Sequence, residues 1–182
     1  PTHDVAACKR FVGAGIEVLV RRALPEALRT DDQIERGVAR MRAVYATRWD
    51  ARTRPYPGIP GLLDQLVTRG RSLAILSNKP HAATVQLTER MLAAWPFDPV
   101  YGARPDAPKK PEPTVALQIA GELGLRAEQV VFVGDSGLDM QTARRAGMTA
   151  VGVAWGFRDR QELWDNGAQH LIERPAQLLA QL

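Results

Sequence analysis

Residues 129–140 have the sequence Gln129-Val130-Val131-Phe132-Val133-Gly134-Asp135-Ser136-Gly137-Leu138-Asp139-Met140. The apolar run Val130–Val133 predicts a parallel strand that is buried on both faces. Gly134 ends this strand and places Asp135 at its carboxyl end, the edge where open α/β sheets bind ligands. Asp139 follows about one helical turn later, so both carboxylates can face one point and hold a hard cation such as Mg2+. The alternative is that Asp135 caps the next helix and Asp139 is a solvated helix residue.

The composition is that of an ordinary globular protein. The chain has 182 residues, of which 45% are hydrophobic and 24% charged, and this is enough for a sizeable core. It has one cysteine, Cys8, and shows neither an apolar run of membrane-spanning length nor a signal-peptide pattern, so we expect a cytoplasmic protein. The net charge is +4, but the basic residues are scattered or paired, so we expect neither a nucleic-acid nor a membrane partner.

The pattern of the chain changes near residue 55. Residues 1–54 predict helices only, with an amphipathic face around Leu19 and Val20 and a capping box from Thr30 to Gln33. After a Pro/Gly-rich joint, strands and helices alternate. We predict strands at 72–76, 99–102, 130–133, 149–153 and 170–172, and helices at 61–69, 80–94, 114–123 and 175–182. This order predicts an α/β domain over 55–182, with a parallel sheet and helices on both faces, beside a small all-helical domain over 1–54.

Two further loops carry polar groups at predicted strand ends. Ser77 and Asn78 offer a hydroxyl, an amide and backbone N–H groups at the start of a helix, which is an anion-binding arrangement or a plain helix cap. Lys110 lies beside Pro111, and the prolines of this loop restrict where its ammonium can point, although a solvated loop lysine is the alternative. Parallel strands should bring both loops to the rim that holds Asp135. Together they supply phosphate ligands, a cation and a metal site, but no nucleophile.

These segments resemble motifs II, III and IV of the haloacid dehalogenase-like phosphohydrolases. The matching stretches are Ser77-Asn78-Lys79-Pro80, Lys110-Pro111-Glu112-Pro113 and Gly134-Asp135-Ser136 with Asp139. Phe11-Val12-Gly13-Ala14-Gly15 and the tail from Trp155 to Ile172 resemble the phosphoglycolate phosphatase subgroup. The resemblance implies a Rossmann-like core with a mobile helical cap over 1–54 and a hinge at Pro55–Pro60. It also implies a Mg2+-dependent phosphatase that hydrolyses a small phosphorylated metabolite, and we expect a monomer or homodimer.

The resemblance also implies a role for each matching residue. Ser77, with the backbone of Asn78, would bind the transferring phosphoryl group, and Lys110 would neutralise its charge. Asp135 would bind Mg2+ and belong to the catalytic set, while Asp139 would hold the metal directly or through water. Phe11, Gly13 and Gly15 would lie near the loop that determines substrate specificity.

One motif of the family has no counterpart in the sequence. Motif I is an apolar strand followed by Asp-x-Asp-Gly-Thr, whose first Asp forms an aspartyl-phosphate. We therefore expect this nucleophile to lie upstream of the chain and the chain alone to be inactive. We also expect the sheet to lack a central strand, which would leave backbone groups of both neighbouring strands unpaired. A hexose-phosphate mutase of the same family, or an inactive or regulatory α/β module, are the alternatives.

Overall fold

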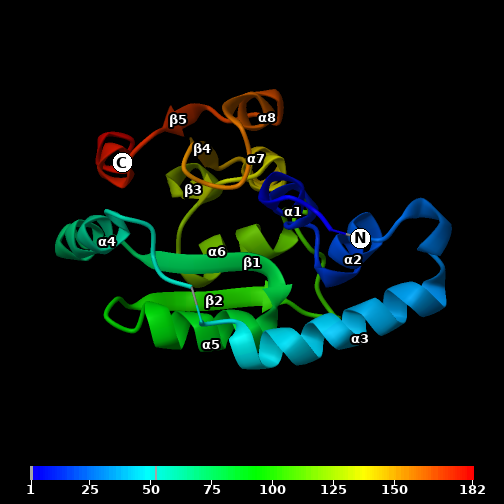
Figure 1. Cartoon of the computed structure of the whole chain (residues 1–182). Helices are drawn as coiled ribbons and strands as arrows, with labels where there is room; N and C mark the ends of the chain where they lie inside the picture. The colour runs from blue at the N-terminus through cyan, green and yellow to red at the C-terminus, as the bar shows by residue number, and fades with distance from the viewer. Residues whose placement is uncertain (1, 52) are drawn as a thin grey trace. The chain divides into compact units, whose positions relative to one another are not determined.

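The structure is a computed structural model that describes residues 2–51 and 53–182. Pro1 and Arg52, which fall in the predicted helical segment, lie outside the described residues. The chain divides into two compact units, Pro1–Arg54 and Pro55–Leu182. In Figure 1 the first unit is coloured blue to cyan and the second cyan to red. Within the described residues, no helix is both long enough and apolar enough to span a lipid bilayer.

The N-terminal unit is helical throughout its regular structure. It contains α1 (Val5–Phe11), α2 (Ile16–Ala23), the 3-10 helix η1 (Glu26–Leu28) and α3 (Asp31–Arg48). The predicted cap of α3 is present, because the Thr30 side chain accepts a hydrogen bond from the Gln33 backbone N–H at 3.4 Å. Gly13 and Gly15, between α1 and α2, have φ angles of 129° and 100°, which L-residues with side chains rarely adopt. The predicted break in the helical pattern is therefore confirmed.

The second unit alternates strands and helices. Its elements are α4 (Ile59–Thr68), β1 (Leu73–Pro80), α5 (His81–Met91), β2 (Phe97–Ala103), α6 (Thr114–Glu122), η2 (Ala127–Gln129), β3 (Val131–Gly134), α7 (Gly137–Ala146), β4 (Thr149–Val153), α8 (Arg160–Asp165), β5 (His170–Ile172) and η3 (Pro175–Ala180). The predicted α/β class is confirmed. We did not predict α8, which Asp159 caps by accepting from the Glu162 N–H at 2.8 Å. The terminal helix is of the 3-10 type rather than the α type.

The predicted parallel sheet is divided in two. Within the described residues, β1 pairs with β2 in one sheet, and β3, β4 and β5 form another in that order, all in parallel. Among these described strands, β1 and β3 therefore each pair with one neighbour. The prediction that Val130–Val133 is buried on both faces is wrong. Val130, Val131 and Phe132 are half-buried and Val133 has an exposed fraction of 41%, in a strand that pairs on one side only within the described residues. In β4, which lies between two neighbours, Ala150 and Val151 are fully buried.

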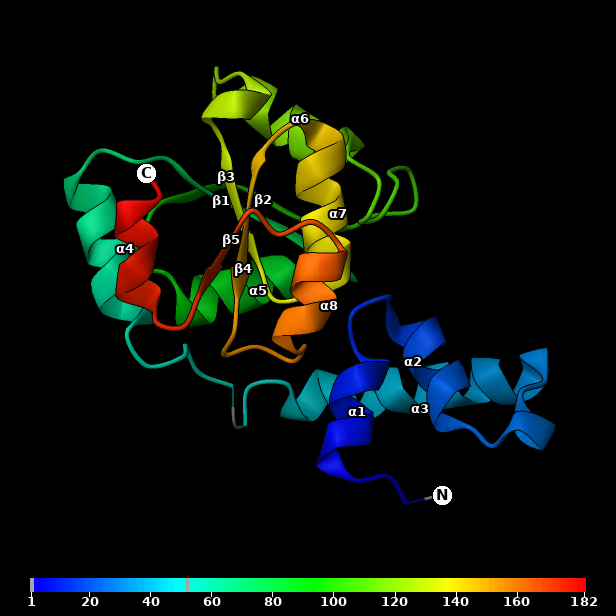
Figure 2. The same ribbon diagram turned by 90° about the horizontal axis from the view of Figure 1, so that it is seen from above.

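Two hydrophobic clusters cover the two faces of these sheets. One cluster joins α6, α7 and α8 to the strands through residues such as Met140, Leu163 and Ala150. The other joins α4 and η3 to the strands through Leu63, Leu178 and Val151. Figure 2 shows α4 and the C-terminal turn on one side of the strands and α6, α7 and α8 on the other. Both clusters contact β1 and β3, so side-chain packing links the two sheets where no backbone ladder does.

Candidate functional site

The Ser77–Lys79 segment is a bulge within β1. Leu76 pairs with Tyr101 and Pro80 with Ala103, so three residues of β1 lie opposite the single residue Gly102. The prediction that the strand ends before Ser77 is therefore wrong, because pairing with β2 resumes at Pro80. Pro80 is the residue that precedes α5, so the alternative in which Ser77 or Asn78 caps this helix is also wrong. A bulge turns side chains out of the regular alternation, and Ser77 Oγ accepts a hydrogen bond from the Lys79 N–H at 3.1 Å.

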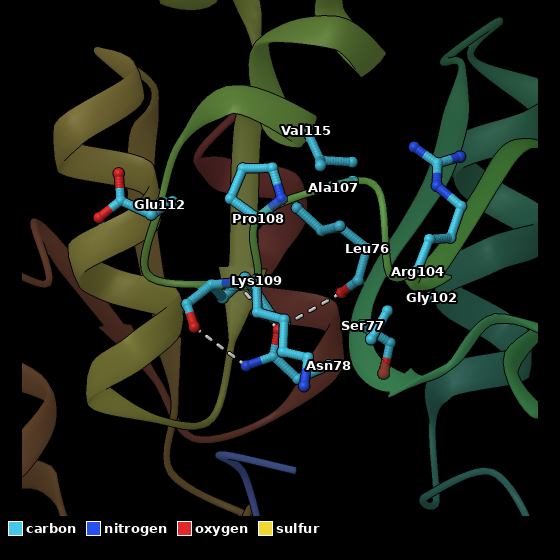
Figure 3. Close-up of a pocket in the computed structure, with 12 residues that line it drawn as sticks. Leu76, Ser77, Asn78, Gly102, Arg104, Ala107, Pro108, Lys109, Glu112 and Val115 are labelled. Carbon is cyan, nitrogen blue, oxygen red and sulfur yellow. Dashed lines mark hydrogen bonds between the residues drawn. The ribbon is translucent and has the colours of Figure 1, made fainter.

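Asn78 bonds to the loop that carries Lys110. Its Oδ1 accepts from the Lys110 backbone N–H at 2.9 Å, and its Nδ2 donates to the Lys110 carbonyl at 3.1 Å. The exposed fraction of Asn78 is 9%, so both bonds are shielded from water. Figure 3 shows the Asn78 amide against this loop, with the hydrogen bonds among the drawn residues dashed. Asn78 is thus tied to the lysine through its side chain, an arrangement that its predicted role did not include.

The Lys110 ammonium is held inside the domain. Its Nζ donates to the Leu76 carbonyl at 3.1 Å and to Asp139 Oδ1 at 2.6 Å. The exposed fractions of the Lys110 and Asp139 side chains are 13% and 7%. The alternative in which Lys110 is a solvated loop residue is therefore wrong. A buried ammonium beside a carboxylate forms a charge-assisted hydrogen bond, and this bond fixes where the positive charge lies.

Asp139 belongs to the cap of α7. Ser136 precedes this helix, and Asp139 Oδ2 accepts from both the Ser136 N–H at 3.1 Å and the Ser136 hydroxyl at 2.6 Å. Asp139 thus reaches back to the residue before the helix as the third residue of a capping box does, with an aspartate in place of the usual Glu or Gln. The alternative in which Asp135 caps the helix and Asp139 is solvated is wrong on both points. One Asp139 oxygen accepts hydrogen bonds from Ser136 at the start of the helix, and the other accepts from the Lys110 ammonium.

Asp135 turns toward the loop that follows β4. Its Oδ2 accepts from the Phe157 backbone N–H at 2.9 Å. A Cβ added at Gly156 would lie 2.1 Å from the Asp135 Cβ, and one added at Gly134 would lie 2.2 Å from the Asp139 Cβ. Real Cβ atoms do not approach so closely, so each carboxylate lies against a glycine backbone. The two glycines therefore provide the room in which these carboxylates sit.

The structure brings part of the predicted set together in one pocket. Ser77, Asn78 and Lys110 line it, and Asp139 is joined to it through the Lys110 ammonium. Arg104 also lines this pocket, but its guanidinium lies 4.3 Å from the centre of the Tyr101 ring and points away from Ser77 (Figure 3). Asp135 is not among the lining residues. Phe11, Gly13 and Gly15 belong to the N-terminal unit, and their part in specificity remains a prediction.

The donor set fits a hard cation with few protein ligands. Within residues 2–51 and 53–182, no group of three or more His, Cys, Asp or Glu side chains is arranged to hold a metal. Asp135 and Asp139 are the carboxylates of the predicted site; both Asp139 oxygens accept hydrogen bonds, whereas the bond of Asp135 to the Phe157 N–H uses Oδ2. Mg2+ keeps several waters and takes one or two carboxylates, whereas a structural zinc site needs four protein ligands. The pair therefore fits Mg2+ better than zinc.

Sequence reasoning missed two side chains that brace this region. Glu162 Oε1 accepts from the Gly137 N–H at 3.2 Å, at the first turn of α7. Arg145 donates to the Pro111 carbonyl at 3.3 Å and to Glu112 at 3.2 Å. Glu162 lies on α8, which we did not predict, and Arg145 contacts a loop 33 residues away in the chain. No local pattern could have revealed either contact.

The family follows from comparison with known proteins. A family model described as haloacid dehalogenase-like hydrolase matches residues 3–153. The chain belongs to this hydrolase family. Two phosphatase relatives support the subgroup that the sequence suggested. A probable phosphoglycolate phosphatase of Pseudomonas putida is 32% identical over 95% of the chain and 70% of its own length. A phosphoglycolate phosphatase of Rhodospirillum rubrum is 37% identical over 85% of the chain and 66% of its own length.

Solved structures of the haloacid dehalogenase-like family share this fold. A crystal structure from Lactobacillus delbrueckii subsp. bulgaricus, provisionally described as a phosphoglycolate phosphatase, has a TM-score of 0.89 and 30% identity over 97% of this chain and 82% of its own. A haloacid dehalogenase-like hydrolase from Streptococcus pneumoniae has a TM-score of 0.86 and is 23% identical. The match covers 100% of this chain and 82% of that hydrolase chain. The predicted family and the likeness to phosphoglycolate phosphatases are confirmed. The chain spans about two thirds of the length of the two phosphatase relatives, 70% and 66%.

Proposed function

We propose that this protein is a Mg2+-dependent phosphatase that hydrolyses a small phosphorylated metabolite, with 2-phosphoglycolate as the first candidate. The observation that carries the proposal is the buried Lys110 ammonium. It is held between the Leu76 carbonyl and Asp139, in a pocket that Ser77 and Asn78 also line. A fixed cation beside hydroxyl and N–H donors is suited to the charge of a phosphoryl group. The relatives named phosphoglycolate phosphatase supply the candidate substrate.

Each site residue has a role in this proposal. The Ser77 hydroxyl and the Asn78 backbone N–H bind oxygens of the phosphoryl group, and Lys110 neutralises their charge. Mg2+, held by Asp135, would neutralise further phosphoryl charge when bound. Asp139 has both oxygens engaged by Lys110 and Ser136, so we assign it contact with the ion through water and the positioning of Lys110. These roles follow the resemblance to the family's motifs, and the hydrogen-bonding capacity and charge of the residues support them.

The helical unit is proposed to act as a cap domain over the α/β core. Residues 1–54 form a compact unit of their own, which supports a division into cap (1–54) and core (55–182). The segment Pro55–Pro60 would be the hinge, and it contains Gly58 with a φ of 85°. Phe11, Gly13 and Gly15 would contribute to specificity, because two glycines with positive φ allow a loop shape that other residues resist. Cap closure would exclude water from the phosphoryl group.

The cellular setting completes the proposal. We assign the protein to the cytoplasm, as a monomer or homodimer without nucleic-acid or membrane partners. The single, exposed Cys8 and the pairing of many arginines with acids, such as Arg160 with Glu173 at 2.5 Å, support this assignment. An arginine that is paired with an acid attracts a phosphate backbone less strongly than an unpaired one.

The test is phosphate release by the natural full-length protein. The protein is incubated with 2-phosphoglycolate, with Mg2+ or with a chelator, and inorganic phosphate is measured. We expect release with Mg2+, little with chelator, and strong loss in Lys110→Ala. The control is Arg160→Gln, which changes an exposed ion pair whose side chains have exposed fractions of 62% and 60%. Wild-type protein that releases no phosphate from 2-phosphoglycolate or other small phosphate esters would overturn the proposal.

A further inference from the structure

The backbone of Lys110 is fixed by one side chain from β1. Asn78 accepts from the Lys110 N–H at 2.9 Å and donates to the Lys110 carbonyl at 3.1 Å, so a single carboxamide satisfies both backbone polar groups. The two residues are 32 positions apart in the chain. An amide that makes both bonds sets the position and the rotation of the lysine Cα. A residue with one polar atom could set only the position.

The lysine tip is held by the same strand. Nζ donates to the carbonyl of Leu76, two residues before Asn78. Lys110 is therefore bonded to β1 through both its backbone and its ammonium. The ammonium also bonds to Asp139, which belongs to α7. Displacement of the Lys110 backbone would pull Nζ away from Leu76 and Asp139 together.

In the part of the chain that the structure describes, the backbone N–H groups of this loop make few hydrogen bonds to other elements. Pro108, Pro111 and Pro113 have no backbone N–H, so three residues around Lys110 cannot donate to an anchor. Its internal backbone bonds are Glu112 N–H to the Lys109 carbonyl at 3.0 Å and Ala107 N–H to the Arg104 carbonyl at 3.5 Å. Neither reaches another element. The loop therefore depends on side chains from elsewhere in the domain.

Arg145 supplies a second, weaker anchor. It donates to the Pro111 carbonyl at 3.3 Å and pairs with Glu112, but the exposed fractions of the two side chains are 47% and 59%. Exposed ion pairs contribute little, since water and salt compete for both partners. The shielded Asn78 bonds are the stronger constraint.

We infer that the Asn78 side chain is a positioning residue, which orients the Lys110 ammonium toward the bound phosphoryl group. This inference rests on the proposed function, and it adds a task for the amide to the phosphate contact assigned to the Asn78 backbone. Removal of the amide leaves the backbone groups of Lys110 without partners, so the loop shifts and the ammonium moves. Because the Asn78 backbone is retained, the variants below separate the two tasks.

The experiment is a double-mutant cycle in the natural full-length protein. Asn78→Ala, Lys110→Ala and the double variant are compared for kcat and KM in phosphate release. We expect Asn78→Ala to lower kcat by about tenfold to hundredfold, because an ångström of misplacement costs about that much. The double variant should match Lys110→Ala, since no ammonium remains to be positioned. A purely structural role predicts a further loss in the double variant, and that result would overturn the inference.

Lysine labelling gives a readout that does not need turnover. The folded protein is pulsed with an acetylating reagent, and modification of Lys110 is followed by mass spectrometry. Release of the ammonium in Asn78→Ala should raise its labelling rate severalfold, while Lys109 in the same loop serves as the internal reference. Thr88→Val is the matched control, because it removes a buried hydroxyl bond to the Thr84 carbonyl at 3.0 Å within α5. It should leave Lys110 labelling unchanged.

The two readouts separate the inference from the function. Unchanged Lys110 labelling in Asn78→Ala overturns the positioning role even if the wild type is an active phosphatase. A wild type without phosphatase activity overturns the proposed function, and with it the orientation toward a phosphoryl group. In that case a labelling increase would still show that Asn78 holds Lys110.

Discussion

The ammonium nitrogen of Lys110 lies 2.6 Å from Oδ1 of Asp139, although the two residues are 29 positions apart. This contact joins the proline-rich loop to the first turn of α7. It also gives each buried charge its opposite, which is the condition under which charged side chains are found inside a protein. The pair is thus both part of the proposed phosphate site and a structural link between two segments of the core.

Asp139→Asn should destabilise the α/β unit. The amide cannot neutralise Lys110, whose exposed fraction is 13%, and loss of one partner from a buried ion pair costs about 3 kcal/mol. Urea denaturation of each variant measures its free energy of unfolding. The control is Arg160→Gln, in an exposed pair with Glu173, which should cost less than about 1 kcal/mol. Equal losses of unfolding free energy in the two variants would mean that the buried Lys110–Asp139 pair stabilises the protein no more than the exposed pair does.

Asp135→Asn should weaken Mg2+ binding. An amide oxygen is a poorer ligand than a carboxylate but can still accept from the Phe157 N–H, so the local structure should persist. We expect the affinity, measured by isothermal titration calorimetry, to fall at least about tenfold. Asp159→Asn is the control, because asparagine caps a helix as well as aspartate does. If both variants bind Mg2+ like the wild type, Asp135 is not a ligand.

Gly134→Ala should destabilise the protein and disturb Asp139. The new methyl group would overlap Asp139, with its Cβ 2.2 Å from the aspartate Cβ, and overpacking of this kind costs about 1–3 kcal/mol. Gly121→Ala is a matched control, because nothing lies within 4 Å of its added Cβ and it sits in α6. Alanine favours a helix, so this variant should be neutral or more stable. Thermal unfolding of both variants tests the prediction, and a stable Gly134→Ala would contradict it.

Tyr101 should lose its proton at higher pH than an ordinary tyrosine. Its hydroxyl donates to Glu122 at 2.8 Å, and this bond, with burial and the Glu122 charge, raises the pKa of Tyr101 above its usual value, although Arg104 opposes the shift. A raised pKa means that the folded state favours the neutral phenol. The contribution of this contact to stability is therefore complete below the usual tyrosine pKa and is lost as the pH rises through the folded value.

Ultraviolet titration of the phenolate tests this shift. Tyr101→Phe identifies the component of the titration curve that belongs to Tyr101. Glu122→Gln should move that component to lower pH, since the acceptor charge is gone. Glu128→Gln, which changes an acid in η2 that pairs with Arg126 instead, should leave it in place. If the Tyr101 component of the titration curve stays at the same pH in Glu122→Gln, the hydrogen bond to Glu122 is not the cause of the raised pKa.

The sequence predicted those features that depend on neighbouring residues. The strand at Thr149–Val153 was placed correctly, because a β-branched run follows the glycine that ends α7. The short helix α8 was missed, since Leu163 is its one buried residue and six positions are too few for a helical period. Strand order predicted that Ser77 and Lys110 meet Asp135 and Asp139, and the structure joins Ser77, Lys110 and Asp139 at one pocket but does not place Asp135 in its lining. The amide bonds of Asn78 to Lys110 were not, because they depend on how a bulge and a distant loop meet.

The division of the strands into two sheets has a consequence for hydrogen exchange. In a continuous sheet, the amides of an inner strand exchange with solvent only when the whole ladder opens. In the 182-residue chain, within its described residues, β1 and β3 each present one edge without a ladder, so their outward amides should exchange early, whereas those between β3 and β4 should exchange late. Within the described residues, side-chain packing and polar contacts such as that of Lys110 with Leu76 and Asp139 join the β1–β2 pair to the β3–β5 sheet, and no backbone ladder does. In this chain we therefore expect the two sheets to open as separate cooperative units, at a lower free energy than global unfolding.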